Sequence, residues 1–152
     1  MAKYEHFQWN WSLNIAMAIL VAVLSVKLDN PLDPIPIFTF MVVQLILVLI
    51  PIMFYGLRTT INDSEITLRY GIGIITIKIP LSDIKKTKVV RNPWYYGIGI
   101  KVIPGGMLYN AHGFDAVEIK YKKTKRKVRI GSAEPLILKY EIDKRIASGR
   151  LN

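Results

Sequence analysis

Residues 35–55 read IPIFTFMVVQLILVLIPIMFY, and this stretch decides how the chain is organised. It contains no charged residue over its whole length. An α-helix rises about 1.5 Å per residue, so roughly 20 apolar residues cross a hydrocarbon core of about 30 Å. The sequence therefore predicts a membrane-spanning helix at about residues 35–55.

A second apolar segment precedes this one. Residues 13–28 read LNIAMAILVAVLSVKL and contain only three polar side chains. Trp9 and Trp11 stand just before it, and tryptophan is enriched where a spanning helix meets the membrane surface. We expect a shorter span at about residues 12–28, with Trp9 and Trp11 as membrane-interface anchors. Residues 29–34, DNPLDP, are typical of a tight turn, so the two spans would form a hairpin.

The charge distribution predicts an orientation. Of the formal net charge of +10, residues 1–55 contribute −1 and residues 56–152 contribute +11. Because basic segments stay on the cytoplasmic side, we expect a cell-membrane protein with two spans and both termini in the cytoplasm. A soluble helical hairpin is the alternative, but the rest of the chain has too little apolar surface to bury two such helices. A cleaved signal peptide fits poorly, because no small-x-small cleavage site follows the first segment.

Residues 57–152 change to the two-residue period of β-strands. In residues 116–121 and 127–130 apolar side chains alternate with basic ones, so one face is core and the other meets water or an anionic partner. About seven strands are expected, at residues 59–70 (a hairpin), 72–79, 87–90, 97–103, 107–109, 116–121 and 127–130. We therefore divide the chain into a transmembrane hairpin at 1–56 and a cytoplasmic domain at 57–152.

The period changes again after Ser132, which can cap a helix. Leu138, Ile142 and Ile146 recur every four residues and form an apolar stripe, and the helix should end before Gly149. We expect a strongly bent sheet or open barrel that is plugged by this amphipathic helix.

Four segments carry a resemblance to a known family. They are residues 79–84 (IPLSDI), 92–100 (NPWYYGIGI), 108–119 (LYNAHGFDAVEI) and 129–135 (RIGSAEP). Their order and spacing resemble prokaryotic pleckstrin-homology-like (bacterial PH) domain proteins over about residues 57–148. Members of that group often carry a two-helix membrane hairpin ahead of the domain. The resemblance implies a transmembrane hairpin followed by a mainly-β PH-like barrel or sandwich with one C-terminal amphipathic helix, and it brings no catalytic residues.

Little in the sequence points to an enzyme. There is no cysteine, and the two histidines, His6 and His112, are too few for a metal site or a catalytic triad without further partners. The motif YGIGI occurs at 70–74 and 96–100, but neither copy continues to a Rossmann or P-loop pattern, so bulges or tight bends explain it better. We expect no catalytic residues, no cofactor, no metal and no small-molecule substrate.

A lysine-rich stretch is the first candidate site. The candidate lipid or anion contacts are Lys120, Lys122, Lys123, Lys125, Arg126, Lys127 and Arg129. A second basic cluster comprises Lys85, Lys86, Lys88 and Arg91. Each Lys or Arg near an anionic leaflet contributes on the order of 1 kcal/mol, so anionic lipid head groups are one partner to expect. A hairpin tip that is merely solvated is the equally weighted alternative.

Trp94, Tyr95 and Tyr96 are the second candidate site. Strand alternation cannot bury three consecutive aromatic residues on one face, so at least one should lie at an interface with a membrane or a protein. Packing of two of the three in the core is the alternative.

These features leave three functional hypotheses. The first is a non-enzymatic, membrane-anchored interaction or scaffold module that assembles with itself or as an accessory subunit of a membrane complex. The second is a sensor of anionic lipid head groups that uses the basic hairpin. The third is membrane-tethered binding of nucleic acid, which the charge favours but no nucleic-acid motif supports.

Overall fold

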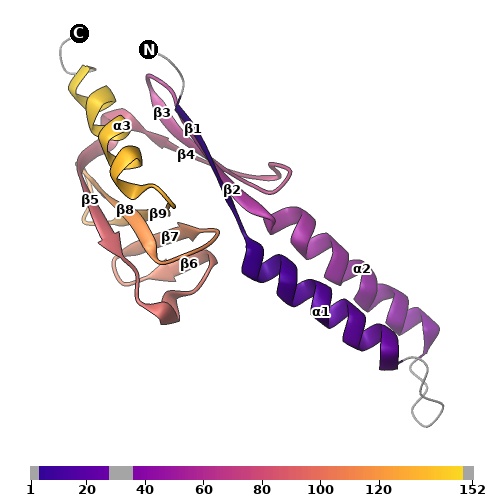
Figure 1. Cartoon of the computed structure of the whole chain (residues 1–152). Helices are drawn as coiled ribbons and strands as arrows, with labels where there is room; N and C mark the ends of the chain where they lie inside the picture. Colours follow the sequence, from indigo (N-terminus) through magenta and orange to yellow (C-terminus); the bar gives the residue numbers. More distant parts are fainter. Residues whose placement is uncertain (1–3, 28–35, 149–152) are drawn as a thin grey trace.

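The structure is a computed structural model that describes residues 4–27 and 36–148. In this part of the chain nine strands, three α-helices and two short 3₁₀ helices follow one another (Figure 1). They are β1 (Tyr4–Trp9), α1 (Trp11–Lys27), α2 (Ile37–Phe54), β2 (Gly56–Ile61), β3 (Glu65–Tyr70), β4 (Ile75–Pro80), η1 (Leu81–Asp83), β5 (Ile84–Arg91), η2 (Trp94–Tyr96), β6 (Gly99–Ile103), β7 (Gly106–Asn110), β8 (Asp115–Tyr121), β9 (Lys127–Gly131) and α3 (Pro135–Ser148).

The strands form two separate sheets. Sheet A has the order β1-β2-β3-β4 and is antiparallel throughout. Sheet B has the order β5-β8-β9-β7-β6, in which β7 and β9 run parallel and the other neighbours antiparallel. The predicted PH-like barrel or sandwich of about seven strands is therefore wrong. Pro80 cannot donate a ladder hydrogen bond, and the η1 turn after it sends the chain into a second sheet instead of closing the first.

Strand β1 is the element that the sequence analysis missed. The sequence analysis considered Trp9 only as an anchor beside a membrane helix, but the side chains of residues 4–9 alternate between more buried and more exposed positions. β1 pairs with β2 over its full length, from Tyr4 opposite Ile61 to Trp9 opposite Gly56. The chain thus leaves sheet A through α1 and returns through α2 at the same end of the sheet.

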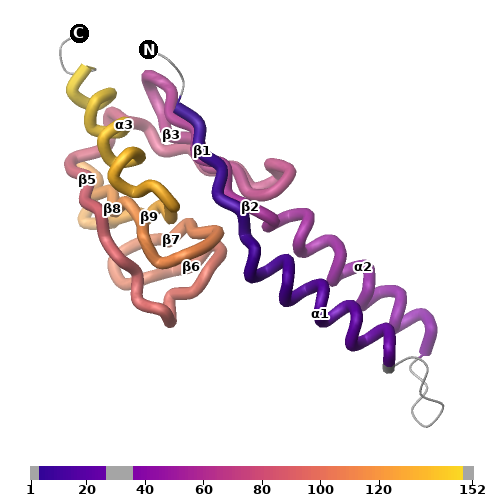
Figure 2. Tube along the Cα trace, in the orientation of Figure 1, coloured from indigo at the N-terminus to yellow at the C-terminus, as the bar shows by residue number. Residues whose placement is uncertain are grey.

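The two N-terminal helices run side by side away from the sheets (Figures 1 and 2). The side chain of Gln44 on α2 donates to the hydroxyl of Ser25 on α1 at 3.2 Å. Among the described residues only α2 is long and apolar enough to cross a membrane, with a mean hydropathy of 2.7 over 18 residues. The predicted two-span transmembrane hairpin is therefore corrected to one span candidate.

The reason for this correction is the length of α1. Its apolar part, Trp11–Val26, is shorter than the length a span requires. Sixteen residues rise only about 24 Å, against a hydrocarbon core of about 30 Å. The predicted turn at residues 29–34, and the residues 28 and 35 that bounded the two predicted spans, lie outside the described residues.

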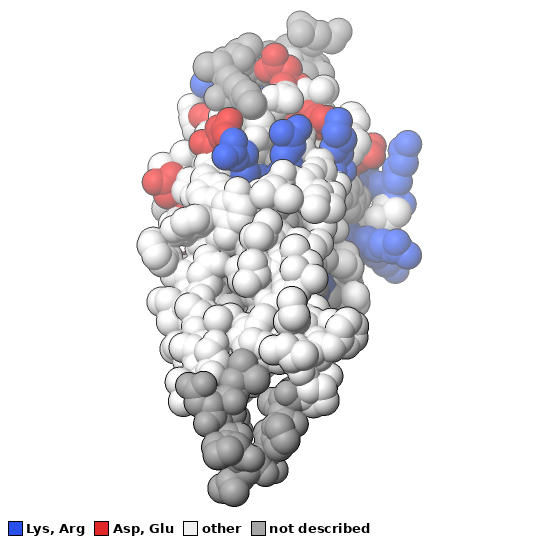
Figure 3. Space-filling view, turned by 90° about the vertical axis from the view of Figure 1, so that its right-hand side faces the viewer, with Lys and Arg blue, Asp and Glu red and all other residues white. Residues whose placement is uncertain are grey.

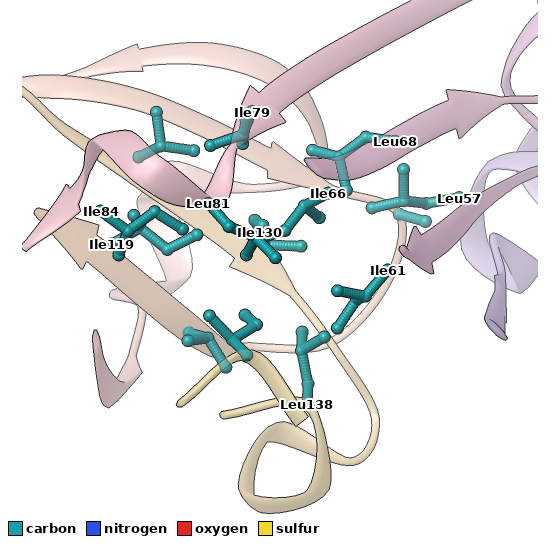
Figure 4. Packing of buried hydrophobic residues seen from close by; sticks show 14 of the residues in the cluster. Leu57, Ile61, Ile66, Leu68, Ile79, Leu81, Ile84, Ile119, Ile130 and Leu138 are labelled. Atoms are coloured by element: carbon teal, nitrogen blue, oxygen red, sulfur yellow. The ribbon is translucent and has the colours of Figure 1, made fainter. Parts of the chain in front are cut away.

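The core lies between the two sheets and α3 (Figure 4). Sheet A contributes Ile66 and Leu68, sheet B contributes Ile119 and Ile130, and the side chains of the two sheets point toward one another. Each fully buried Leu or Ile side chain contributes about 1.5–3 kcal/mol relative to an exposed one. These contacts hold the two sheets together although no strand passes from one ladder to the other.

The C-terminal helix α3 is present, and it buries Leu138 and Ile142 against β5, β8 and η1. Ser132 precedes it and accepts a hydrogen bond from the backbone N–H of Glu134 at 3.1 Å. The helix therefore covers one part of the core rather than plugging a barrel.

A glycine brings the β3–β4 turn against the end of α2. Gly71 has a φ of +49°, and its N–H donates to the carbonyl of Gly56 at 3.0 Å. A Cβ at Gly71 would collide with the carbonyl oxygens of Ile52 and Met53, so only glycine allows this approach. The turn is thereby fixed beside the last residues of α2.

Candidate functional site: a basic hairpin and an aromatic loop

The hairpin between β8 and β9 carries most of the predicted basic residues. Lys120 and Lys127 are paired opposite each other at its base, and residues 122–126 at its tip are all exposed. Lys85, near the start of β5, lies beside these hairpin residues and lines the same cavity. The sequence analysis had grouped it with Lys86, Lys88 and Arg91 instead. Seven cations line a cavity of about 580 Å³: Lys85, Lys120, Lys122, Lys123, Lys125, Arg126 and Lys127.

The β6–β7 turn closes this cavity on its other side. The N–H of Lys127 donates to the carbonyl of Gly105 at 2.9 Å, and Pro104 and Gly105 both line the cavity. A Cβ at Gly106 would collide with the backbone of Lys127, so the two turns can approach only because residue 106 has no side chain. No Asp or Glu is among the described residues that line the cavity, which makes it a site of one sign of charge.

Arg129 has a different role from its neighbours. Its guanidinium donates to Glu118 Oε2 from Nε at 2.9 Å and to Asn92 Oδ1 from Nη1 at 2.9 Å, and it lies 5.8 Å from the ring centre of Tyr96. Its side chain is only 14% exposed. These contacts hold the Arg129 guanidinium inside the domain, and Arg129 is not among the residues that line the basic cavity.

The Glu118 carboxylate is the acidic partner in this network. Burial raises its pKa, but the hydrogen bond from Arg129 and the charges of Lys127, Arg129 and Lys120 outweigh burial, so the pKa is lowered. Glu118 and Arg129 are direct neighbours across β8 and β9, which is the pairing that strand alternation allows for opposite charges.

The aromatic residues 94–96 form the short helix η2 between β5 and β6. Trp94 is 79% exposed and Tyr95 is 65% exposed, while Tyr96 is half-buried and stacks on Arg129. The ring centres are 6.0 Å apart for Trp94 and Tyr95 and 5.2 Å apart for Tyr95 and Tyr96. The loop therefore presents two large aromatic side chains to the outside and fixes the third.

A buried asparagine holds this loop in place. The side-chain amide of Asn110 donates to the carbonyl of Gly97 at 3.3 Å and to that of Gly113 at 2.8 Å. Asn110 is fully buried at the end of β7. The exposure of Trp94 and Tyr95 is thus imposed by a fixed backbone.

Trp9 and Trp11 lie where the helices meet sheet A. The ring centre of Trp9 is 5.7 Å from that of Trp11, 5.3 Å from that of Tyr55 and 5.5 Å from that of Phe7. Tyr55 follows α2, so this aromatic cluster surrounds the base of both helices. The sequence predicted the two tryptophans as anchors, with Phe7 as a further aromatic residue before the helix. The structure adds Tyr55 from the end of α2 to this cluster.

The basic hairpin lies at the end of the molecule remote from the helices. β4 starts at Ile75 near α2 and ends at Pro80, and six strand residues separate these ends by about 17 Å. Beyond Pro80, the N–H of Lys122 donates to the carbonyl of Asp83 at 2.8 Å. In Figure 1, β5 begins at the upper left, while α1 and α2 extend to the lower right.

No described set of three or more His, Cys, Asp or Glu side chains could hold a metal ion. His6 Nδ1 lies 3.6 Å from Glu134 Oε2. The carbonyl of His112 accepts a hydrogen bond from the side chain of Gln8 at 2.6 Å. Each of these contacts joins a residue of β1, His6 or Gln8, to a segment outside sheet A.

Comparisons with known proteins give no family for this chain. No family model matches it, and no curated protein matches its sequence. The resemblance to prokaryotic PH-like proteins stays a prediction from four short motifs.

Proposed function

We propose that this chain is a non-enzymatic interaction module that is attached to a membrane through α2. Its basic hairpin binds an acidic protein partner, as an accessory subunit of a membrane complex. The excess of basic residues after α2 favours the cytoplasmic side for the sheets.

One observation carries this proposal: the apolar helices and the basic cavity lie at opposite ends of the molecule. α2 has one buried residue, Leu47, and most of its other apolar side chains are exposed, where an outside partner such as lipid can cover them. The cavity at the other end has seven cations and room for acidic side chains. A module that is held at one end and charged at the other can recruit a partner to a membrane surface.

The same separation counts against the hypothesis of lipid binding by the hairpin. The hairpin lies beyond the far end of β4, about 17 Å from the strand end beside α2. Electrostatic attraction between exposed charges is screened over about 8 Å at physiological ionic strength. Head groups of the membrane that holds α2 are therefore a weaker partner for these lysines than a protein that approaches from the cytoplasm.

Nucleic acid is also a weaker partner than an acidic protein. Binding of single strands combines basic grooves with aromatic stacking platforms. The exposed aromatic pair, Trp94 and Tyr95, is not among the residues that line the basic cavity, where Tyr121 is the only aromatic side chain described.

The test uses the intact chain in nanodiscs, with its mass and the identity of co-purifying chains measured by native mass spectrometry. Two variants are compared with the wild type. The hairpin variant carries Lys122→Gln, Lys123→Gln, Lys125→Gln and Arg126→Gln. The control variant carries Lys86→Gln, Lys88→Gln, Arg91→Gln and Lys101→Gln, which removes the same charge from exposed positions outside the cavity.

We expect a defined hetero-assembly for the wild type and the control, and a loss of partner of about tenfold or more for the hairpin variant. A clean monomer for the wild type would contradict the proposal. Equal loss in both variants would show that net charge, and not the cavity, attracts the partner.

A further inference from the structure

The outer face of sheet A has a pair of arginines close to the base of the helices. Arg58 on β2 and Arg69 on β3 are direct cross-strand neighbours, and both are exposed. Phe7 on β1 flanks Arg58, and Thr76 on β4 flanks Arg69. These four side chains form one row across the sheet.

Two like charges directly opposite each other destabilise a sheet unless an anion compensates them. Glu5 compensates one of them, because its Oε1 lies 3.0 Å from Arg58 Nη1. Arg69 makes no ion pair or hydrogen bond through its side chain with any residue that the structure describes. Its guanidinium therefore has free N–H donors in a fork that fits phosphate oxygens.

Two exposed isoleucines lie beside this pair. Ile72 is 61% exposed and Ile74 is 68% exposed, in the β3–β4 turn that follows Arg69. The contact of Gly71 with the carbonyls of Ile52 and Met53 fixes this turn against the end of α2. The isoleucines thus extend the apolar surface of α2 sideways.

The depth of these groups matches the layers of a bilayer. The 18 residues of α2 rise about 27 Å, close to a hydrocarbon core of about 30 Å. Arg58 is two strand residues beyond Gly56, the start of β2, so it lies at most about 7 Å from the helix end. The head-group layer on each side of a bilayer is about 5–8 Å thick. The arginine pair falls in that layer, and the basic hairpin falls outside it.

The surface view agrees with this arrangement. In Figure 3, which faces the right-hand side of Figure 1, a row of Lys and Arg side chains, with Asp and Glu side chains beside it, borders a broad surface made almost entirely of uncharged residues. The aromatic rings of Trp9, Trp11 and Tyr55 lie at the same junction of helix and sheet. Aromatic side chains and cations at such a border are typical of a membrane interface.

We propose that Arg58 and Arg69 bind the phosphate of an anionic phospholipid, while Ile72 and Ile74 insert beside α2 at the boundary of head groups and acyl chains. This inference rests on the membrane attachment of α2 proposed above. It is independent of the acidic partner at the other end, and it assigns the lipid contact to sheet A instead of the lysine hairpin.

The experiment measures which lipids stay on the protein. The intact chain is reconstituted in nanodiscs that contain phosphatidylglycerol and phosphatidylcholine, and retained lipids are counted by native mass spectrometry after release into detergent. The test variants are Arg69→Gln alone and Arg58→Gln with Arg69→Gln. The single variant leaves the Glu5–Arg58 pair intact, so it remains informative if the double variant is poorly folded. The control variant, Lys86→Gln with Lys88→Gln, removes two exposed charges from β5.

We expect the wild type and the control to retain phosphatidylglycerol over phosphatidylcholine. The preference should fall about tenfold in the double variant and less in the single one, as for loss of charge-assisted hydrogen bonds. An unchanged preference in both test variants would overturn the inference. So would a loss of preference confined to the Lys122, Lys123, Lys125 and Arg126 variant.

Two further measurements separate the possible failures. Glycerol phosphate added to the protein in detergent should compete only weakly for the retained lipid, and competition as strong as that of the lipid would indicate a site for soluble phosphates. Flotation of the wild type with liposomes tests the attachment itself. A protein that does not float would contradict the proposed function, whereas one that floats without lipid preference would contradict the arginine site alone.

Discussion

Helices α2 and α3 bury apolar side chains to very different extents. In α3 a narrow stripe, Leu138 and Ile142, is almost completely buried against η1, β5 and β8, and most of the charged side chains lie outside this stripe. In α2 apolar side chains surround the helix, and only Leu47 is buried. The comparison teaches that the core of the fold covers the apolar stripe of α3, whereas most of the apolar surface of α2 is left uncovered by the described residues.

The sharpest test of this comparison is the same substitution in each helix. Leu138→Ala removes a fully buried side chain, and we expect a loss of about 2–5 kcal/mol in the free energy of unfolding. Leu45→Ala in α2 is the matched control, because Leu45 is 58% exposed, and it should cost less than about 0.5 kcal/mol in detergent. Chemical denaturation followed by circular dichroism measures both values. Similar losses would mean that α2 is packed within the protein.

The joint between α2 and sheet A gives the next largest effect. Gly71→Ala introduces a Cβ against the carbonyls of Ile52 and Met53 at a positive φ, and we expect a loss of about 2–3 kcal/mol. Gly73→Ala is the control, because its φ is also positive but its Cβ would meet only Arg69 Cδ, at 4.0 Å. It should cost about 1 kcal/mol. Thermal unfolding in detergent compares them, and equal costs would argue against the close contact with α2.

A pH titration tests the network inside sheet B. The pKa of Glu118 is lowered in the folded protein from its ordinary value of 4.5, so its contribution to stability is present above 4.5 and is lost as the pH falls through the folded value. We expect wild type to be more stable than Glu118→Gln at neutral pH, by about 1–3 kcal/mol.

This difference should begin to shrink as the pH falls below 4.5, since the Glu118 carboxyl of the unfolded chain then takes up a proton. It should be smallest below the folded pKa, where Glu118 is neutral in both states like the glutamine. Urea denaturation of both proteins over the acidic range measures it. A difference that stays constant with pH would show that the Arg129 contact depends on shape and not on charge.

The smallest effect on stability is expected in the aromatic loop. Trp94→Ser and Tyr95→Ser remove side chains that are 79% and 65% exposed, so each should change the free energy of unfolding by less than about 0.5 kcal/mol. Tyr96→Ser should cost more, because Tyr96 contacts Arg129. Thermal melts of the three variants test this order. A large cost for Trp94→Ser would place this loop with the core, like α3, and not with the exposed surfaces.

The sequence predicted some elements well because their signals are local. The apolar run of α2 and the stripe of α3 both appear from spacing alone, and the alternation of β8 and β9 predicted their pairing. Strand β1 was missed because the aromatic residues at positions 7, 9 and 11 are equally typical of a membrane border. The pairing that identifies β1 lies about 50 residues away along the chain, in β2, and no local pattern contains it.

For the candidate sites too, the sequence predicted the local features and missed those that depend on contacts between distant residues. The sequence identified the lysines of the hairpin, but it also grouped Arg129 with them, since it cannot tell that Glu118 and Asn92 bind this guanidinium. It placed Lys85 in a separate cluster because 35 residues separate it from Lys120. It gave no sign of the Arg58–Arg69 pair, which depends on the register of β2 against β3.

The sequence by itself determined that residues 35–55 are apolar enough for a membrane, that a basic β-rich part follows them, and that an amphipathic helix follows the strands, although it also predicted a second span that the structure does not support. These features depend on the pattern of apolar and polar side chains among neighbouring residues. The hydrophobic effect acts on such a pattern whatever the tertiary structure around it, so the sequence alone reveals it. The tertiary structure decided that there are two sheets, that β1 brings both helices to one end, and that the basic hairpin lies at the other. Those outcomes depend on strand register and on contacts between distant residues, such as Gly71 with α2, which composition and periodicity do not contain.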